Sequence, residues 1–125
     1  MRNTGRLVAL VGMLVGAAAP AFAHHAFSAE FDQSKPVKMS GEITKLEWTN
    51  PHAFIYLEVK DEKAGKMVEW EIELMSLNHL RSYGWTSKTV KVGEVLSATG
   101  APAKSGAPSM IANRIKLPDG REIRS

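Results

Sequence analysis

The sequence predicts a mostly β protein, built as a small five-stranded OB-like barrel with one short helix between its third and fourth strands. Three observations support this fold: five short segments alternate apolar and polar residues, the first of them is long and changes phase midway, and one helix-forming segment lies between the third and fourth. A bent first strand allows five strands to close on themselves. We therefore favour the barrel over an open antiparallel sandwich with one helical crossover.

The first expected strand spans residues 37–49 and contains the phase change. Apolar or small residues occupy alternate positions as far as Ile43, and Leu46 and Trp48 then continue on the opposite face. A phase slip close to a glycine, here Gly41, indicates a bulge and a strong bend.

The next two strands form an expected hairpin with a glycine-containing loop. Residues 53–59 place apolar side chains at every second position, with Phe54 and Tyr56 on the opposite face. Residues 69–74 alternate apolar side chains with three glutamates, and this phase assigns Trp70 to the core.

A short helix is expected after the third strand. Ser76 can cap its N-terminus, Leu77 and Leu80 share a face, and Gly84 can end it. Trp85 follows directly and is expected to pack beneath the barrel. The remaining strands and turns are expected at residues 92–99 (fourth strand), 100–108 (loop), 110–117 (fifth strand), 118–120 (turn) and 122–123 (a brief last strand).

The N-terminal segment has the three-part layout of a secretory signal peptide. Residues 1–6 are basic, residues 7–19 are apolar, and small residues precede an expected cleavage between Ala23 and His24. The alternative is a membrane anchor, but residues 7–19 would rise only about 20 Å as a helix, against roughly 30 Å of hydrocarbon. We therefore expect a periplasmic or secreted protein with no stable membrane insertion after processing. Its expected parts are a signal peptide (1–23), an N-terminal arm (24–36) and the barrel domain (37–125).

Composition excludes several classes of function. The chain has 16 Lys and Arg against 13 Asp and Glu, and removal of the leader with Arg2 and Arg6 leaves 14 against 13. This near-neutral balance argues against a nucleic-acid binder, which needs clustered cations. The absence of cysteine excludes disulfides, thiolate metal sites and cysteine nucleophiles. None of the common catalytic motifs is present, and we expect a protein that is not an enzyme.

Three histidines suggest a metal site. Cleavage after Ala23 would make His24 the N-terminus, where its α-amino nitrogen and its ring can chelate one ion. His52, which follows the turn signal Asn50-Pro51, is the expected remote ligand, since an OB-like fold puts this loop at the barrel rim. His25 offers a second binding mode through the amine, the intervening amide and its own ring. Nitrogen donors of this kind favour Cu(II), so we expect copper as the cofactor if the site exists.

The histidines also have simpler interpretations. The pair at the expected mature terminus can be a solvated end, and His52 can close its turn through its ring. His79, the fourth histidine, is expected on the helix surface. If a metal is bound, Glu30 or Asp32 is the expected oxygen ligand.

The outward-facing aromatics suggest a second function, a non-catalytic binding module. Phe54 and Tyr56 resemble the side chains on which OB-like sheets stack ligands. The glutamates of the third strand would repel phosphates there, so the expected partner is a glycan, a peptide or another envelope component and not a nucleic acid. A structural envelope protein with no small ligand is the third possibility.

Several short motifs stand out along the chain: His24-His25-Ala26-Phe27, Glu30-Phe31-Asp32, Glu47-Trp48-Thr49-Asn50-Pro51-His52-Ala53, Gly84-Trp85 and Gly93-Glu94. With these motifs the chain resembles a family of small exported bacterial proteins known only as a domain of unknown function. The resemblance implies a signal-bearing, single-domain, mostly β protein, and it brings no activity, cofactor or catalytic residue.

Overall fold

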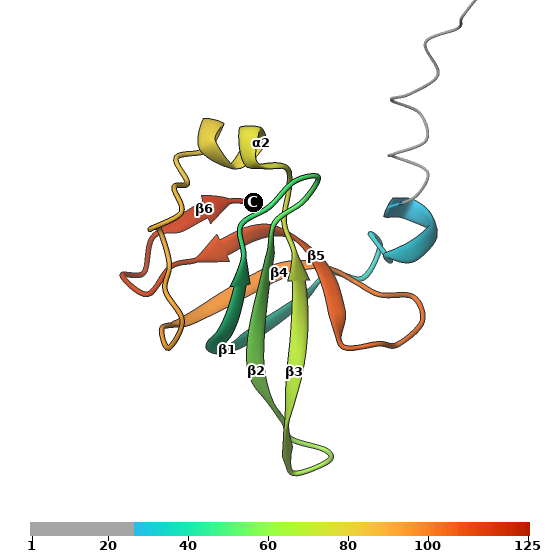
Figure 1. Ribbon diagram of the computed structural model, residues 1–125. Coiled ribbons are helices and arrows are strands. Elements are labelled where there is room, and N and C mark those ends of the chain that lie inside the picture. The colour runs from blue at the N-terminus through green and yellow to red at the C-terminus, as the bar shows by residue number, and fades with distance from the viewer. Residues whose placement is uncertain (1–26) are drawn as a thin grey trace, which may run out of the picture.

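The computed structural model describes residues 27–125, and these form a β-barrel with one short helix between the third and fourth strands and a helical turn at residues 27–30 (Figure 1). The elements are β1 (Val37–Glu47), β2 (Phe54–Asp61), β3 (Lys66–Glu73), α2 (Leu77–Ser82), β4 (Val95–Pro102), β5 (Ser109–Lys116) and β6 (Glu122–Arg124).

The sheet closes on itself. Its strand order is β3-β2-β1-β4-β5-β6, with neighbours antiparallel, and β3 also pairs with β5 in parallel. Five strands therefore form a closed barrel, and β6 is an extra strand along β5. This confirms the OB-like barrel with a helix between the third and fourth strands, and the open sandwich is excluded.

Strand β1 bends as its sequence predicts. The register between β1 and β2 shifts between Ile43 and Lys45, which is the expected bulge. The first half of β1 pairs with β4 and the second half with β2, so this one strand joins the two halves of the barrel. At the bend a Cβ on Gly41 would collide with the backbone carbonyl of Glu58, which explains why glycine occurs there.

The core contains the apolar faces of the strands together with Trp85. This side chain is only 2% exposed, and its indole N–H donates a 2.6 Å hydrogen bond to the carbonyl oxygen of Arg124. Trp70, predicted as a core residue, is only half-buried. The difference arises because a surface hollow bordered by Gly106 and Pro108 opens beside its ring.

The helix forms where the sequence predicts it, but β4 does not begin there. Ser76 caps α2 and accepts from the backbone N–H of His79. The expected fourth strand starts at residue 92, whereas β4 starts at Val95 and continues to Pro102. The reason is Gly93, whose φ of 92° makes a turn there and whose N–H donates to the carbonyl of Ile43.

The described part of the N-terminal arm packs on the barrel. A helical turn covers residues 27–30, and Phe31 is buried and forms a bridge with Ala103. The expected signal peptide, its cleavage point, His24 and His25 lie outside the described residues. Within residues 27–125 no helix is long and apolar enough to cross a membrane.

Candidate functional site

His52 lies at the rim of the barrel in the loop between β1 and β2, as predicted. Two backbone hydrogen bonds fix this loop beyond the end of the hairpin ladder, from Leu74 to Ala53 (2.8 Å) and from Ala53 to Met75 (3.2 Å). They hold the His52 ring beside the last residue of β3. There its Nδ1 lies 2.6 Å from Oε1 of Glu73, and both side chains are largely buried, at 24% and 15% exposure.

This contact determines which nitrogen of His52 can meet a ligand. When Nδ1 carries the proton and donates to Glu73, Nε2 keeps its lone pair. Histidines that bind metals usually have this arrangement, in which a carboxylate fixes the tautomer and the orientation of the ring. Sequence reasoning missed Glu73, although its position at the end of the third strand, opposite the start of the second, was a usable signal.

The arm covers the same histidine. The ring of Phe27 stacks on that of His52, with centroids 5.1 Å apart and planes 24° from parallel. Lys104 holds the arm in place, since its backbone N–H donates to the carbonyl of Glu30 (2.8 Å) and its Nζ to that of Ser28 (2.6 Å). The first described residue of the arm therefore lies directly over the rim histidine.

The two expected oxygen ligands differ in position. Glu30 lines a surface hollow of about 500 Å³ together with Glu71 and Glu73. The carboxylate of Asp32 instead accepts hydrogen bonds from the side chain and backbone of Ser34, which lower the pKa of Asp32 below its ordinary value. Within residues 27–125 no cluster of three or more His, Cys, Asp or Glu side chains could hold a metal ion.

A second feature is the outer face of the β2–β3 hairpin. Tyr56 lies directly opposite Glu71, and Phe54 lies opposite Glu73. Because cross-strand partners project from the same side of a sheet, the two aromatics and the glutamates share one surface. The rings of Phe54 and Tyr56 lie 6.5 Å apart and 30° from parallel.

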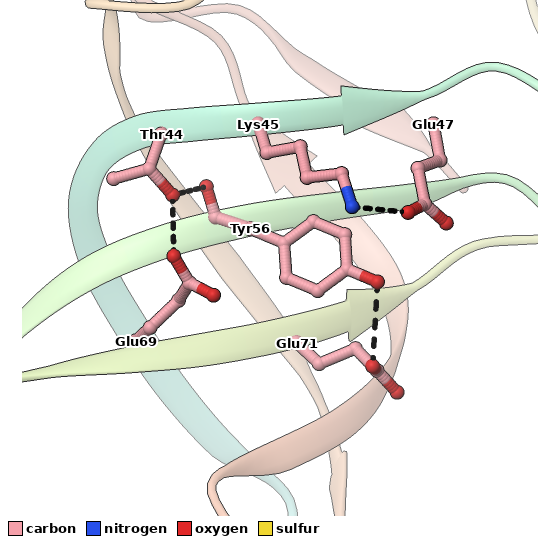
Figure 2. A network of polar contacts seen from close by, with 6 residues as sticks. All are labelled: Thr44, Lys45, Glu47, Tyr56, Glu69 and Glu71. Atoms are coloured by element: carbon pink, nitrogen blue, oxygen red, sulfur yellow. Dashed lines mark hydrogen bonds and ion pairs between the residues drawn. The ribbon is translucent and has the colours of Figure 1, made fainter.

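The bulge in β1 adds polar side chains to this surface (Figure 2). Nζ of Lys45 lies 5.0 Å from the centroid of the Tyr56 ring and 2.6 Å from Oε1 of Glu47. Thr44, the residue next to Lys45, donates to Oε2 of Glu69 at 3.0 Å. The phase slip that bends the strand therefore turns two consecutive side chains toward the hairpin.

The environment of this surface is anionic. Burial raises the pKa of Tyr56 above 10.0, and the negative charges of Glu71 and Glu47 raise it further. The hydrogen bond and the charge of Glu47 likewise raise the pKa of Lys45. The shift of Lys45 and the carboxylate contribution to the shift of Tyr56 mean that the surface favours positive charge and opposes additional negative charge.

These features define an OB-like β-barrel whose rim histidine is oriented by a carboxylate and covered by an N-terminal arm. The chain belongs to a family of unknown function, DUF6152, whose model matches residues 11–112. This confirms the resemblance found in the motifs. No curated protein matches the chain. The family supplies no activity, so function has to be argued from the chemistry of the site.

Proposed function

We propose that this protein binds Cu(II) outside the cytoplasm and serves in handling or delivering the metal. The ligands are Nε2 of His52 and the amine and ring of His24 after removal of residues 1–23, with His25 as a further ligand. The observation that carries the proposal is the 2.6 Å contact between Nδ1 of His52 and Oε1 of Glu73. A proton on Nδ1 that is donated to this carboxylate leaves the lone pair of Nε2 available to a metal ion. The role is binding without catalysis.

The position of the arm supports a shared site. Phe27 stacks on His52, and His24 precedes Phe27 by three residues. Three residues of extended chain span at most about 11 Å. An N-terminus at His24 can therefore reach the rim without moving Phe27.

The donor set favours copper over the commoner divalent ions. An α-amine titrates near pH 7.7–8.0 and an imidazole near 6.5, so both are available to a metal close to neutral pH. Nitrogen donors bind Cu(II) most tightly among the divalent first-row metals.

The test begins with protein produced from the full-length gene in a secreting bacterial host. Mass spectrometry identifies the first residue, and Cu(II) titration followed by electron paramagnetic resonance reports nitrogen coordination. His52→Asn retains an N–H donor near the position of Nδ1 and removes Nε2, so we expect it to weaken copper binding more than tenfold. Glu73→Gln should weaken it by roughly tenfold or more through loss of ring orientation.

His79→Asn is the matched control, because His79 lies exposed on α2. It should bind copper as the parent does. A purified chain that begins at another residue, or a His52→Asn variant with parental affinity and an unchanged nitrogen signature, would show that the proposed site is wrong.

A second candidate function, a non-catalytic binding module, has its own observation in its favour. Phe54 and Tyr56 lie side by side on the outer face of β2, and both rings are partly exposed. A ligand on this face would not need the terminal amine of His24.

A further inference from the structure

We propose that the outer face of β1–β3 binds a lysine- or arginine-rich peptide segment of a partner protein. We call this surface the acidic face. The inference deepens the binding-module alternative and does not depend on copper binding. The acidic face consists of Phe54 and Tyr56 with the carboxylates of Glu47, Glu58, Glu69, Glu71 and Glu73.

Charge complementarity is the first argument. The carboxylates of Glu47, Glu58, Glu69 and Glu71 face outward on three adjacent strands, and that of Glu73 lies at the rim, largely buried against His52. The alternation of β1 and β2 places Glu42, Lys38, Lys45 and Lys60 on the same side, so acids outnumber bases there. The whole chain nevertheless has an excess of bases, 16 against 13 acids. The negative charge is therefore local, and it matches a cationic partner.

Lys45 of this protein already makes the kind of contact that a bound cation would make. Nζ of Lys45 lies over the ring of Tyr56 while pairing with Glu47. A ring face and a carboxylate together are the two groups that attract an ammonium or guanidinium ion. The Lys45 side chain is 59% exposed, so a partner cation can share or replace its position. Phe54 offers a second ring beside it.

The acidic face also has depth. Glu71 and Glu73 line the hollow of about 500 Å³ that lies between β3, the arm and the β4–β5 loop. Glu30 and Lys104 line its other side, and Nζ of Lys104 donates to the carbonyl of Ser28. A long basic side chain can enter it and place its charge among three carboxylates. Glu71 accepts from the hydroxyl of Tyr56 at 3.4 Å, which connects the hollow to the aromatic pair.

The two arginines of the β5–β6 pair in a second copy of this chain are a weaker match. Arg114 pairs with Glu122 at 3.8 Å, and the guanidinium of Arg124 lies 4.9 Å from the centroid of the Tyr83 ring. These arginines are already compensated within their own subunit. A neutral glycan would stack on the rings and donate hydroxyl hydrogen bonds to the carboxylates, but it would leave their negative charge uncompensated.

The test uses protein from the full-length gene, with fluorescein-labelled hexa-arginine and hexalysine as probes and hexaglutamate as the control peptide. Anisotropy should report binding of both cationic peptides, weakened by added salt. Hexa-arginine should bind more tightly, since guanidinium stacks on rings and pairs with carboxylates in a bidentate manner. Tyr56→Ser should weaken hexa-arginine binding roughly three- to tenfold.

Matched neutral substitutions separate a site from general attraction. The double variant Glu58→Gln/Glu69→Gln should weaken binding by at least about fivefold, whereas Glu62→Gln/Asp119→Asn, two exposed acids elsewhere, should change it less than twofold. Circular dichroism verifies that each variant is folded. Equal losses in both double variants, an unchanged affinity in Tyr56→Ser, or capture of neutral oligosaccharides in place of the peptides would overturn the proposal.

Two further readouts distinguish this inference from the other possibilities. Peptide binding should persist in EDTA and in His52→Asn, so a failure of the copper proposal leaves it intact. Sedimentation velocity at low salt should show a monomeric protein, and adding a cationic peptide should not change that state. A dimer that hexa-arginine disrupts would identify a second copy as the occupant and refute a separate partner.

Discussion

The two halves of the barrel sheet have opposite charge and compensate it differently. In the β2–β3 hairpin two acids, Glu58 and Glu69, lie directly opposite each other. In the β5–β6 pair two bases, Arg114 and Arg124, are in the same relation. Like charges at such positions are destabilising, so each half contains the same unfavourable arrangement.

In the basic half, both members of the opposed pair have a compensating partner. Arg114 pairs with Glu122, and Arg124 lies over the ring of Tyr83. In the acidic half, Thr44 donates to Glu69, but the carboxylate of Glu58 has no hydrogen-bonding or ion-pair partner among residues 27–125. The comparison indicates that the arginines contribute to the fold, whereas Glu58 retains charge that an external ligand can neutralise.

The largest effect is expected at the join between the halves. Gly41→Ala places a Cβ against the backbone carbonyl of Glu58, and backbone cannot move aside as a flexible side chain would. We expect a loss of about 3 kcal/mol in the free energy of unfolding, measured by urea denaturation. The neighbouring Ser40→Ala loses only a 2.6 Å contact between exposed hydroxyls of Ser40 and Ser97, and it should cost about 1 kcal/mol or less. Equal costs for both variants would contradict the close approach at the bend.

A charge reversal tests the uncompensated glutamate. Glu58→Lys converts the pairings with Glu42 and Glu69 from like to opposite charge. We expect it to stabilise the fold by about 0.5–1 kcal/mol at low salt, with the gain reduced in high salt. The same variant should bind hexa-arginine less well than the parent, because it replaces a carboxylate of the acidic face with a positive charge. Stability and ligand binding would then change in opposite directions.

Removing the corresponding charge on the basic half should change the free energy of unfolding less. Arg114→Gln removes the repulsion from Arg124 but also the ion pair with Glu122. These changes oppose each other, and the net effect should lie within about 0.5 kcal/mol. A gain as large as that of Glu58→Lys would remove the contrast between the two halves.

Local patterns in the sequence predicted the backbone of both halves. The phase change after Ile43 identified the bulge, and Ser76 and Gly84 identified the ends of the helix, because such features depend on neighbouring residues. The start of β4 was wrong, since the hydrogen bond between Gly93 and Ile43 joins distant segments. The half-exposure of Trp70 depends in the same way on a distant loop.

The site was predictable only in its individual residues. The sequence identified His52 as a rim residue and Tyr56 as outward-facing. It did not reveal Glu73 beside His52, 21 residues later, or Phe27 stacked upon it. These contacts depend on the register of the hairpin and on the path of the arm, neither of which periodicity determines.

The smallest expected effect concerns the ionisation of Tyr56. Burial and the negative charges of Glu71 and Glu47 raise its pKa above 10.0. Glu71→Gln removes one of these charges and should lower the pKa, with the contribution of burial retained. The chain has two tyrosines, so a Tyr83→Phe background leaves Tyr56 as the only phenol, and tyrosinate absorbance during an alkaline titration follows it alone.

The sign of the accompanying stability change follows from the direction of the shift. The folded pKa lies above the unfolded value, so the contribution of the protonated phenol is complete below pH 10 and is lost as the pH rises through the folded pKa. Glu71→Gln should move that loss to lower pH. Glu122→Gln, on the basic half, should leave the tyrosinate titration unchanged. If both substitutions shifted it equally, the field at Tyr56 would reflect the net charge of the protein, and the acidic face would not be a separate electrostatic region.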